Sequence, residues 1–140
     1  MQKPIILTAA AAFAMATPAI AETPVLTVLT YDSFTSEWGP GPAVEAAFEE
    51  TCGCDLQFVG AGDGAALLAR LQLEGPSTEA DIVLGLDTNL TAAARETGLF
   101  ASHGITADLD LPVSWDDAEF LPFDWGYFAD RKSTRLNSSH

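Results

Sequence analysis

The chain has 140 residues, 48% of them hydrophobic, a composition that suits one globular domain with a core of its own. Its formal net charge is −14, and between Glu22 and Ala129 only Arg70 and Arg95 stand against nineteen acidic residues. Such an acidic excess argues against nucleic acids and other phosphate-rich partners, and it is compatible with a cationic ligand.

The first 21 residues are predicted to be a secretory signal peptide. Lys3 precedes the apolar run "PIILTAAAAFAMA", and the small residues "AIA" come directly before Glu22. A basic residue, a short apolar core and an A-x-A site are typical of a cleaved export signal, whereas a membrane span needs about 20 strongly apolar residues. The mature protein is therefore expected to begin near Glu22 and to be exported.

From Val25 onward, strand and helix patterns alternate. The runs "VLTVLTY", "DLQFV" and "ADIVLGL" predict strands at 25–31, 55–59 and 80–86, the third of them covered on both faces. The segments "PAVEAAFEETCG", "GAALLARLQLEGP" and "TNLTAAARETGLF" predict helices at 42–53, 64–76 and 88–100, the second with its leucines facing inward. Beyond Gly98 the pattern weakens, although "LPFDWGYFA" at 121–129 predicts one more strand.

Alternation of this kind predicts an α/β domain with a mainly parallel sheet. In such sheets ligands bind at the carboxyl ends of the strands, where loops lead into helices. The three loops in that position are 31–41, 60–64 and 85–89. We therefore expect a binding site at the edge of the sheet that these loops share.

The last eleven residues, 130–140, read "DRKSTRLNSSH" and contain three of the six basic residues. They show no apolar periodicity, and they back-translate to a common sequencing-library adapter. We expect them to be adapter read-through, and the native domain is expected to span residues 22–129.

Cys52 and Cys54, spaced C-G-C, are the two cysteines of the chain. In an exported protein they are expected to close a small disulfide that acts as a local staple at the end of a helix. The spacing is neither C-x-x-C nor half of a zinc ribbon. A secreted thiol-disulfide module nevertheless remains an alternative function of another class.

Motifs of catalysis are absent from the sequence. There is no G-x-S-x-G elbow, and "GAGDG" at 60–64 lacks the spacing of a phosphate-binding loop. His103, the one histidine before the last eleven residues, is expected to be a surface residue of a loop. No set of residues has the spacing of a metal site. The chain is therefore predicted to be a non-enzyme with no metal and no cofactor.

Aromatic and acidic side chains remain as ligand-binding candidates. In "YDSFTSEWGPG", the rings of Tyr31 and Trp38 can stack on a flat cationic heterocycle. Alternatively, Phe34 and Trp38 staple the loop onto the following helix, and Tyr31 is a core tyrosine. Asp63 can cap the next helix or bind a ligand amine or hydroxyl, and Gly64 lets a ligand approach the first amides of that helix. These alternatives stay open on the residues alone.

Four segments carry a family resemblance: "LTVLTYDSFTSEWGPGPAVEAAFEE", "CGCDLQFVGAGDGAALLARLQLEG", "ADIVLGLDTNL" and "PFDWGYFA". Together they resemble the thiamine-binding periplasmic proteins of bacterial ABC importers. The resemblance implies a type II periplasmic binding protein fold of two α/β lobes, of which only the N-terminal lobe is present. It places ligand contacts at Asp63 and Gly64, and cleft-lining rings at Tyr31 and Trp38.

The function implied by this resemblance is capture of thiamine or its phosphates in the periplasm and delivery to an ABC-type membrane permease, without covalent chemistry. After signal removal the protein is not expected to be embedded in the membrane. The alternative ligands within the same fold are a polyamine or ferric ion, because the fold alone does not determine the solute.

Overall fold

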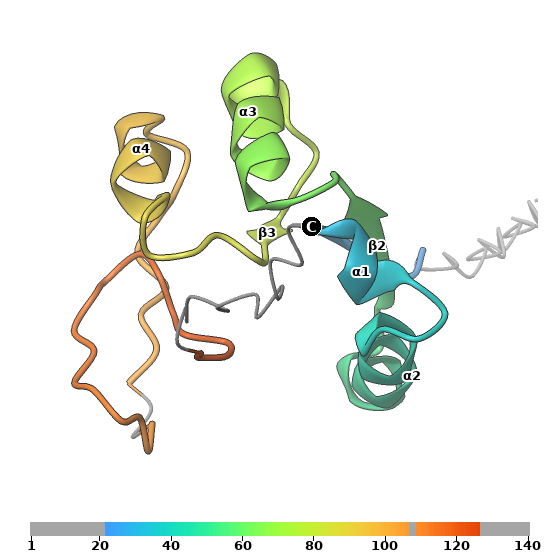
Figure 1. Cartoon of the computed structure of the whole chain (residues 1–140). Helices are drawn as coiled ribbons and strands as arrows, with labels where there is room; N and C mark the ends of the chain where they lie inside the picture. Colours follow the sequence, from blue (N-terminus) through green and yellow to red (C-terminus); the bar gives the residue numbers. More distant parts are fainter. Residues whose placement is uncertain (1–21, 107–108, 127–140) are drawn as a thin grey trace, which may run out of the picture.

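A computed structural model describes residues 22–106 and 109–126 (Figure 1). The predicted signal peptide (1–21), the predicted read-through (130–140) and residues 127–129 of the last predicted strand lie outside the described residues. In chain order the elements are β1 (Val25–Thr30), α1 (Asp32–Thr35), α2 (Gly41–Cys52), β2 (Asp55–Gly60), α3 (Gly64–Glu74), the 3-10 helix η1 (Gly75–Ser77), β3 (Ile82–Val83) and α4 (Thr91–Glu96).

The sheet has three strands in the order β2-β1-β3, and both pairings are parallel. All six residues of β1 pair with β2, from Val25 opposite Asp55 to Thr30 opposite Gly60, whereas only Val28 and Leu29 pair with β3. The predicted α/β class with a parallel sheet is confirmed. Because β2 and β3 both run parallel to the central strand β1, the carboxyl ends of all three strands lie at one edge of the sheet.

Helix α3 covers one face of this sheet and forms the core. Leu67 and Leu71 are buried on its inner side, as the apolar spacing predicts, and they pack with Leu29 of β1. Partly buried residues of both neighbouring strands join this cluster, among them Val59 and Val83. Within the described residues no helix is long and apolar enough to span a membrane.

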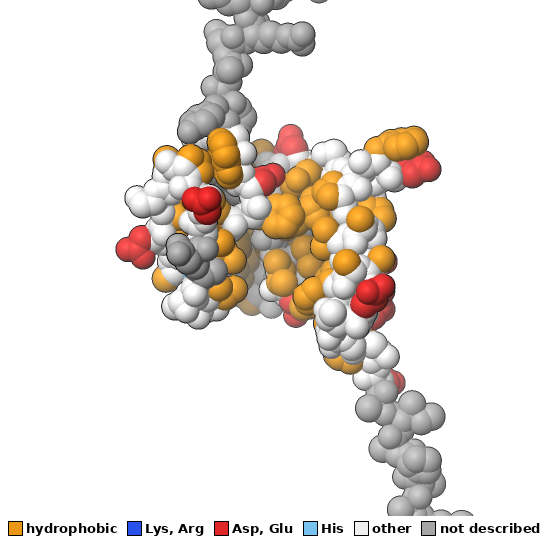
Figure 2. Space-filling view, turned by 90° about the horizontal axis from the view of Figure 1, so that it is seen from below, with side chains coloured by type: hydrophobic (Ala, Val, Ile, Leu, Met, Phe, Trp, Pro, Cys, Tyr) orange, Lys and Arg blue, Asp and Glu red, His pale blue; other side chains and the backbone are white. Residues whose placement is uncertain are grey.

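Helix α2 lies against the other face, where it covers β2 (Figure 1). Much of this face stays open: Val44 and Phe48 of α2 are exposed, and Ile82 of β3 is 46% exposed. Seen from below, hydrophobic side chains gather over the centre of the molecule (Figure 2). The prediction that the third strand is covered on both faces is therefore wrong at Ile82.

Helix α1 is a four-residue turn of helix within the 31–41 loop, and no periodic pattern predicts so short an element. Its Phe34 is fully buried and makes edge-to-face contacts with Tyr31, Phe58 and Phe123, at centroid distances of 5.6, 5.1 and 5.8 Å. Phe34 is thus a core residue that anchors the loop through ring contacts with β2 and with Phe123.

Two predicted strands differ from the structure. The strand predicted at 80–86 is only Ile82–Val83, because Gly85 has φ +111° and leaves the extended conformation. The described part of the strand predicted at 121–129 is not a strand. Pro122 has no N–H to donate to a ladder, and the ring of Phe123 packs on Phe34 instead.

Residues 117–120 are held against α4 by a group of contacts centred on Asp117. One oxygen of its carboxylate, Oδ2, lies 2.7 Å from Nη2 of Arg95, and the other accepts the backbone N–H groups of Glu119 and Phe120. The Arg95 guanidinium stacks over the Phe120 ring at 5.1 Å. His103 adds a bond between Nε2 and the Asp117 carbonyl oxygen.

The hydrogen bond from Arg95, helped by the two backbone N–H groups, lowers the pKa of Asp117 to about 2. A carboxylate with a lowered pKa stabilises the fold above its ordinary pKa, and this stabilisation is lost as the pH falls toward 2. We therefore expect Asp117→Asn to lower the melting temperature by a few degrees at neutral pH and by progressively less below pH 4, as measured by circular dichroism. The neighbouring Asp116→Asn is the control, and identical acid profiles for Asp117→Asn and the parent would contradict the assignment.

Candidate functional site

The loops after β1 and β2 are joined by backbone hydrogen bonds at the carboxyl edge of the sheet. The N–H of Ala61 donates to the Thr30 carbonyl at 2.8 Å, which extends the β1–β2 pairing into the loop. One residue further on, the N–H of Asp32 donates to the Gly62 carbonyl at 2.9 Å, and the N–H of Gly62 donates to Oδ1 of Asp32 at 2.9 Å. These two loops therefore form one connected unit.

The loop after β3 contacts the other two loops at two glycines, Gly85 and Gly64. A Cβ at Gly85 would lie 2.8 Å from Cε1 of Tyr31, so the bare Cα of Gly85 lies against the Tyr31 ring. A Cβ at Gly64 would lie 2.9 Å from the Gly85 carbonyl oxygen. Neither position has space for a side chain. Tyr31, Gly64 and Gly85 are thus in contact although they come from three different strand ends.

Asp63 occupies the N-cap of α3. Its Oδ1 accepts the N–H of Ala66 at 2.8 Å, while its backbone is extended, as an N-cap residue requires. Asp63 therefore caps α3, as one of the two alternatives predicts. The cap uses Oδ1 and leaves the second carboxylate oxygen, Oδ2, available to accept another hydrogen bond. Gly64 is the first residue of α3, where backbone N–H groups have no partner within the helix.

Trp38 does not join this group. It lies in the connection between α1 and α2, and its side chain is 91% exposed. So exposed a ring neither staples the loop onto α2 nor packs on Tyr31. Of the four residues predicted to bind a ligand, the structure brings Tyr31, Asp63 and Gly64 to one edge and leaves Trp38 in solvent.

The acidic side chains at this edge have no cationic partner within residues 22–106 and 109–126. Arg70 is paired with Glu74 at 2.6 Å, and Arg95 is paired with Asp117. The carboxylates of Asp32, Asp63 and Asp87, by contrast, accept only backbone N–H groups among the described residues. The edge therefore presents negative charge close to an aromatic ring, an arrangement suited to a positively charged ring system.

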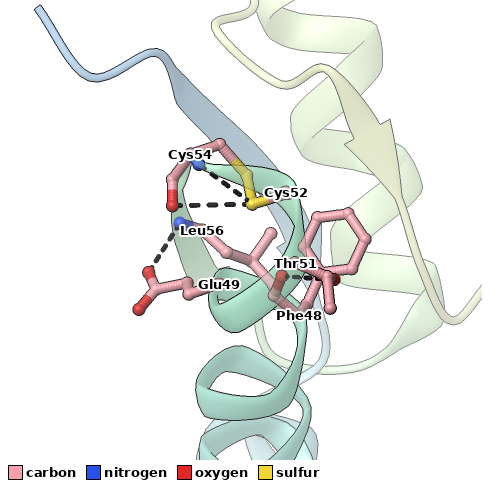
Figure 3. The surroundings of a disulfide bond; sticks show 6 residues. All are labelled: Phe48, Glu49, Thr51, Cys52, Cys54 and Leu56. Carbon is pink, nitrogen blue, oxygen red and sulfur yellow. Dashed lines mark hydrogen bonds between the residues drawn. A yellow bond between two sulfur atoms is a disulfide. The ribbon is translucent and has the colours of Figure 1, made fainter.

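Cys52 and Cys54 form a disulfide at the end of α2 (Figure 3). Gly53 between them has φ +63°, the left-handed conformation in which helices commonly end. In the same corner Oε1 of Glu49 accepts the N–H of Leu56 at 2.9 Å, on the outer edge of β2. Because β2 begins at Asp55, the disulfide lies at the opposite end of this strand from the Gly60–Gly64 loop.

Two further features bear on the site. An open hollow of about 320 Å³ lies between the C-terminal ends of α3 and α4, and none of the four predicted residues lines it. No group of His, Cys, Asp or Glu within the described ranges could hold a metal ion.

Two residues of the site, Asp32 and Gly85, were not predicted from the sequence. Both lie in loops that follow strands of the parallel sheet, which is where ligand-binding residues are expected.

The sequence of this chain is similar to those of several proteins of known name. No family model matches the chain. The thiamine-binding periplasmic protein of Escherichia coli K12 is 56% identical over 107 residues, which make up 76% of this chain and 33% of that protein. The protein of the same name from Haemophilus influenzae is 47% identical over 104 residues, 73% of this chain and 31% of that protein.

A solved structure titled periplasmic thiamin binding protein superposes with a TM-score of 0.73 at 50% identity, covering 81% of this chain and 36% of that one. The resemblance to the thiamine-binding periplasmic proteins is confirmed. The chain spans about a third of the length of the curated relatives it matches. Likeness to this family in fold also confirms the predicted type II periplasmic binding protein class.

The contact between Gly85 and Tyr31 can be tested directly. We expect Gly85→Ala to displace the Tyr31 ring and to destabilise the fold by about 1–3 kcal/mol, because the new methyl group meets the ring and the positive φ is strained for alanine. Aromatic NMR shifts of Tyr31 and urea denaturation measure the two effects. Gly126→Ala is the control, since its Cβ would meet nothing within 4 Å. Unchanged Tyr31 shifts in Gly85→Ala would contradict the geometry.

Proposed function

We propose that the complete protein captures thiamine, or a thiamine phosphate, in the periplasm and delivers it unchanged to an ABC-type membrane permease. The observation that carries this proposal is the similarity in sequence and fold to proteins named for thiamine binding. A second relative, a probable ABC transporter periplasmic-binding protein of Sinorhizobium fredii, is 33% identical over 131 residues and supports the transport context. The described residues would form part of one lobe of such a protein.

The chemistry of the carboxyl edge fits this ligand. Thiamine carries a permanently positive thiazolium ring and an aminopyrimidine ring with an exocyclic amine. Asp63 has one oxygen engaged in the helix cap, so the other is available to the amine, and Gly64 allows the ligand to approach the first amides of α3. Tyr31 supplies a ring face, worth about 0.5–2 kcal/mol against a cation.

Trp38 has a different role in this proposal. Because its side chain is 91% exposed, it is free to close onto a ligand that is already in contact with Tyr31. Contacts that a ligand makes with two lobes at once favour the closed arrangement of a hinged binding protein. The permease would then recognise the closed, ligand-bound form of the protein, and no covalent bond of the ligand would be made or broken.

Isothermal titration calorimetry of the complete protein tests the proposal. We expect thiamine to bind at micromolar protein concentrations, and spermidine and ferric ion to give no heat of binding. Thiamine monophosphate and diphosphate in the same panel define the preferred form. Binding of spermidine or ferric ion with no thiamine binding would assign another solute to the same fold and contradict the proposal.

A further inference from the structure

We propose that Asp32 is a positioning residue that holds the Gly60–Gly64 loop in its ligand-binding shape before any ligand arrives. The inference rests on the proposed function, because it concerns the loop that presents Asp63 and Gly64. Asp32 itself would make no contact with the ligand. Its role would be to keep the neighbouring loop from rearranging.

Two reciprocal hydrogen bonds carry the argument. Asp32 donates its backbone N–H to the Gly62 carbonyl and accepts the Gly62 N–H on Oδ1, each at 2.9 Å. Both polar groups of one loop residue are thereby satisfied by one residue 30 positions earlier in the chain. Asp32 lies in the first turn of α1, yet its carboxylate reaches across to the neighbouring loop.

The loop needs such a restraint because of its composition. It reads "GAGDG", and Gly62 has φ +82°, in the region that favours glycine. Glycine loses more conformational freedom on ordering than any other residue, so a loop with three glycines is costly to order when a ligand binds. Asp32 fixes Gly62, and the Asp63 cap fixes Ala66. The proposed ligand contacts Asp63 and Gly64 lie between these two tethers.

The close contact between Asp32 and Gly60 limits which side chain at position 32 can accept the Gly62 N–H. A Cβ at Gly60 would lie 2.6 Å from Oδ1 of Asp32, so the carboxylate fits closely against the bare Cα of Gly60. Asparagine has the same shape and can present its Oδ1 to the Gly62 N–H. Glutamate keeps the charge but is one methylene longer, so its carboxylate oxygen is displaced from the position in which Oδ1 of Asp32 accepts the Gly62 N–H.

The experiment therefore compares Asp32→Asn with Asp32→Glu in the complete protein. A positioning role predicts that Asp32→Asn keeps thiamine affinity within about threefold and that Asp32→Glu loses at least about tenfold, the effect of one lost hydrogen bond to a charged group. Asp55→Glu, at the opposite end of β2, is the matched control and should bind as the parent does. Loss of affinity in Asp32→Asn together with full affinity in Asp32→Glu would assign a purely electrostatic role and overturn the proposal. Equal losses in both variants would overturn it as well, because the variant that keeps the shape of Asp32 would then not keep the affinity.

A second readout does not depend on thiamine. Amide hydrogen exchange of Gly62, Gly64 and Ala66 in the ligand-free protein should be faster in Asp32→Glu than in the parent and unchanged in Asp32→Asn. Unchanged exchange in Asp32→Glu would overturn the positioning role whether or not thiamine binds. Failure of the parent to bind thiamine, with the predicted exchange pattern present, would instead contradict the proposed function alone.

Discussion

The parallel pairing of β1 with both of its neighbours is the constraint on which the other features of the molecule depend. Parallel strands end at the same edge, so the loops that follow β1, β2 and β3 come together although their residues are as much as 54 positions apart, from Tyr31 to Gly85. The N–H of Ala61 continues the β1–β2 ladder beyond the last paired residues. The candidate site is therefore a direct product of strand order.

At this edge the loops pack closely because glycines allow the backbone to approach its neighbours. Gly85 accommodates the Tyr31 ring, and Gly64 accommodates the Gly85 carbonyl. Larger residues at either position would separate the loops. Beneath them Phe34 is completely buried and fixes the start of the 31–41 loop. The same edge holds carboxylates that have no cationic partner among the described residues, because Arg70 and Arg95 are paired elsewhere.

Local patterns in the sequence predict β1, β2, α2 and α3 closely, whereas the helix predicted at 88–100 is shorter in the structure, where α4 is Thr91–Glu96. Leu67 and Leu71 recur at helical spacing and are buried, and the helix at α2 ends at Gly53 as expected. Helix α1 escapes prediction because four residues are too few to show a period. The third strand is overestimated because an apolar run does not reveal that Gly85 has a positive φ.

Parts of the site depend on long-range contacts that no local pattern encodes. Asp32 reads as a loop residue, and only the fold shows that it binds Gly62 30 positions away. Tyr31 is predicted as a ring near the ligand edge, but its contact with Gly85 follows from strand order. Trp38, by contrast, is predicted to bind the ligand because it is an aromatic residue in a loop at the ligand edge, but it is exposed to solvent in this structure.

A crystal structure of the complete protein grown with thiamine tests the account most directly. The account predicts that the ligand lies at the carboxyl edge of β1 and β2, with its amine near Asp63, its rings near Tyr31 and the first turn of α3 beside it. Thiamine bound elsewhere, with Tyr31, Asp63 and Gly64 all left in solvent, would contradict it.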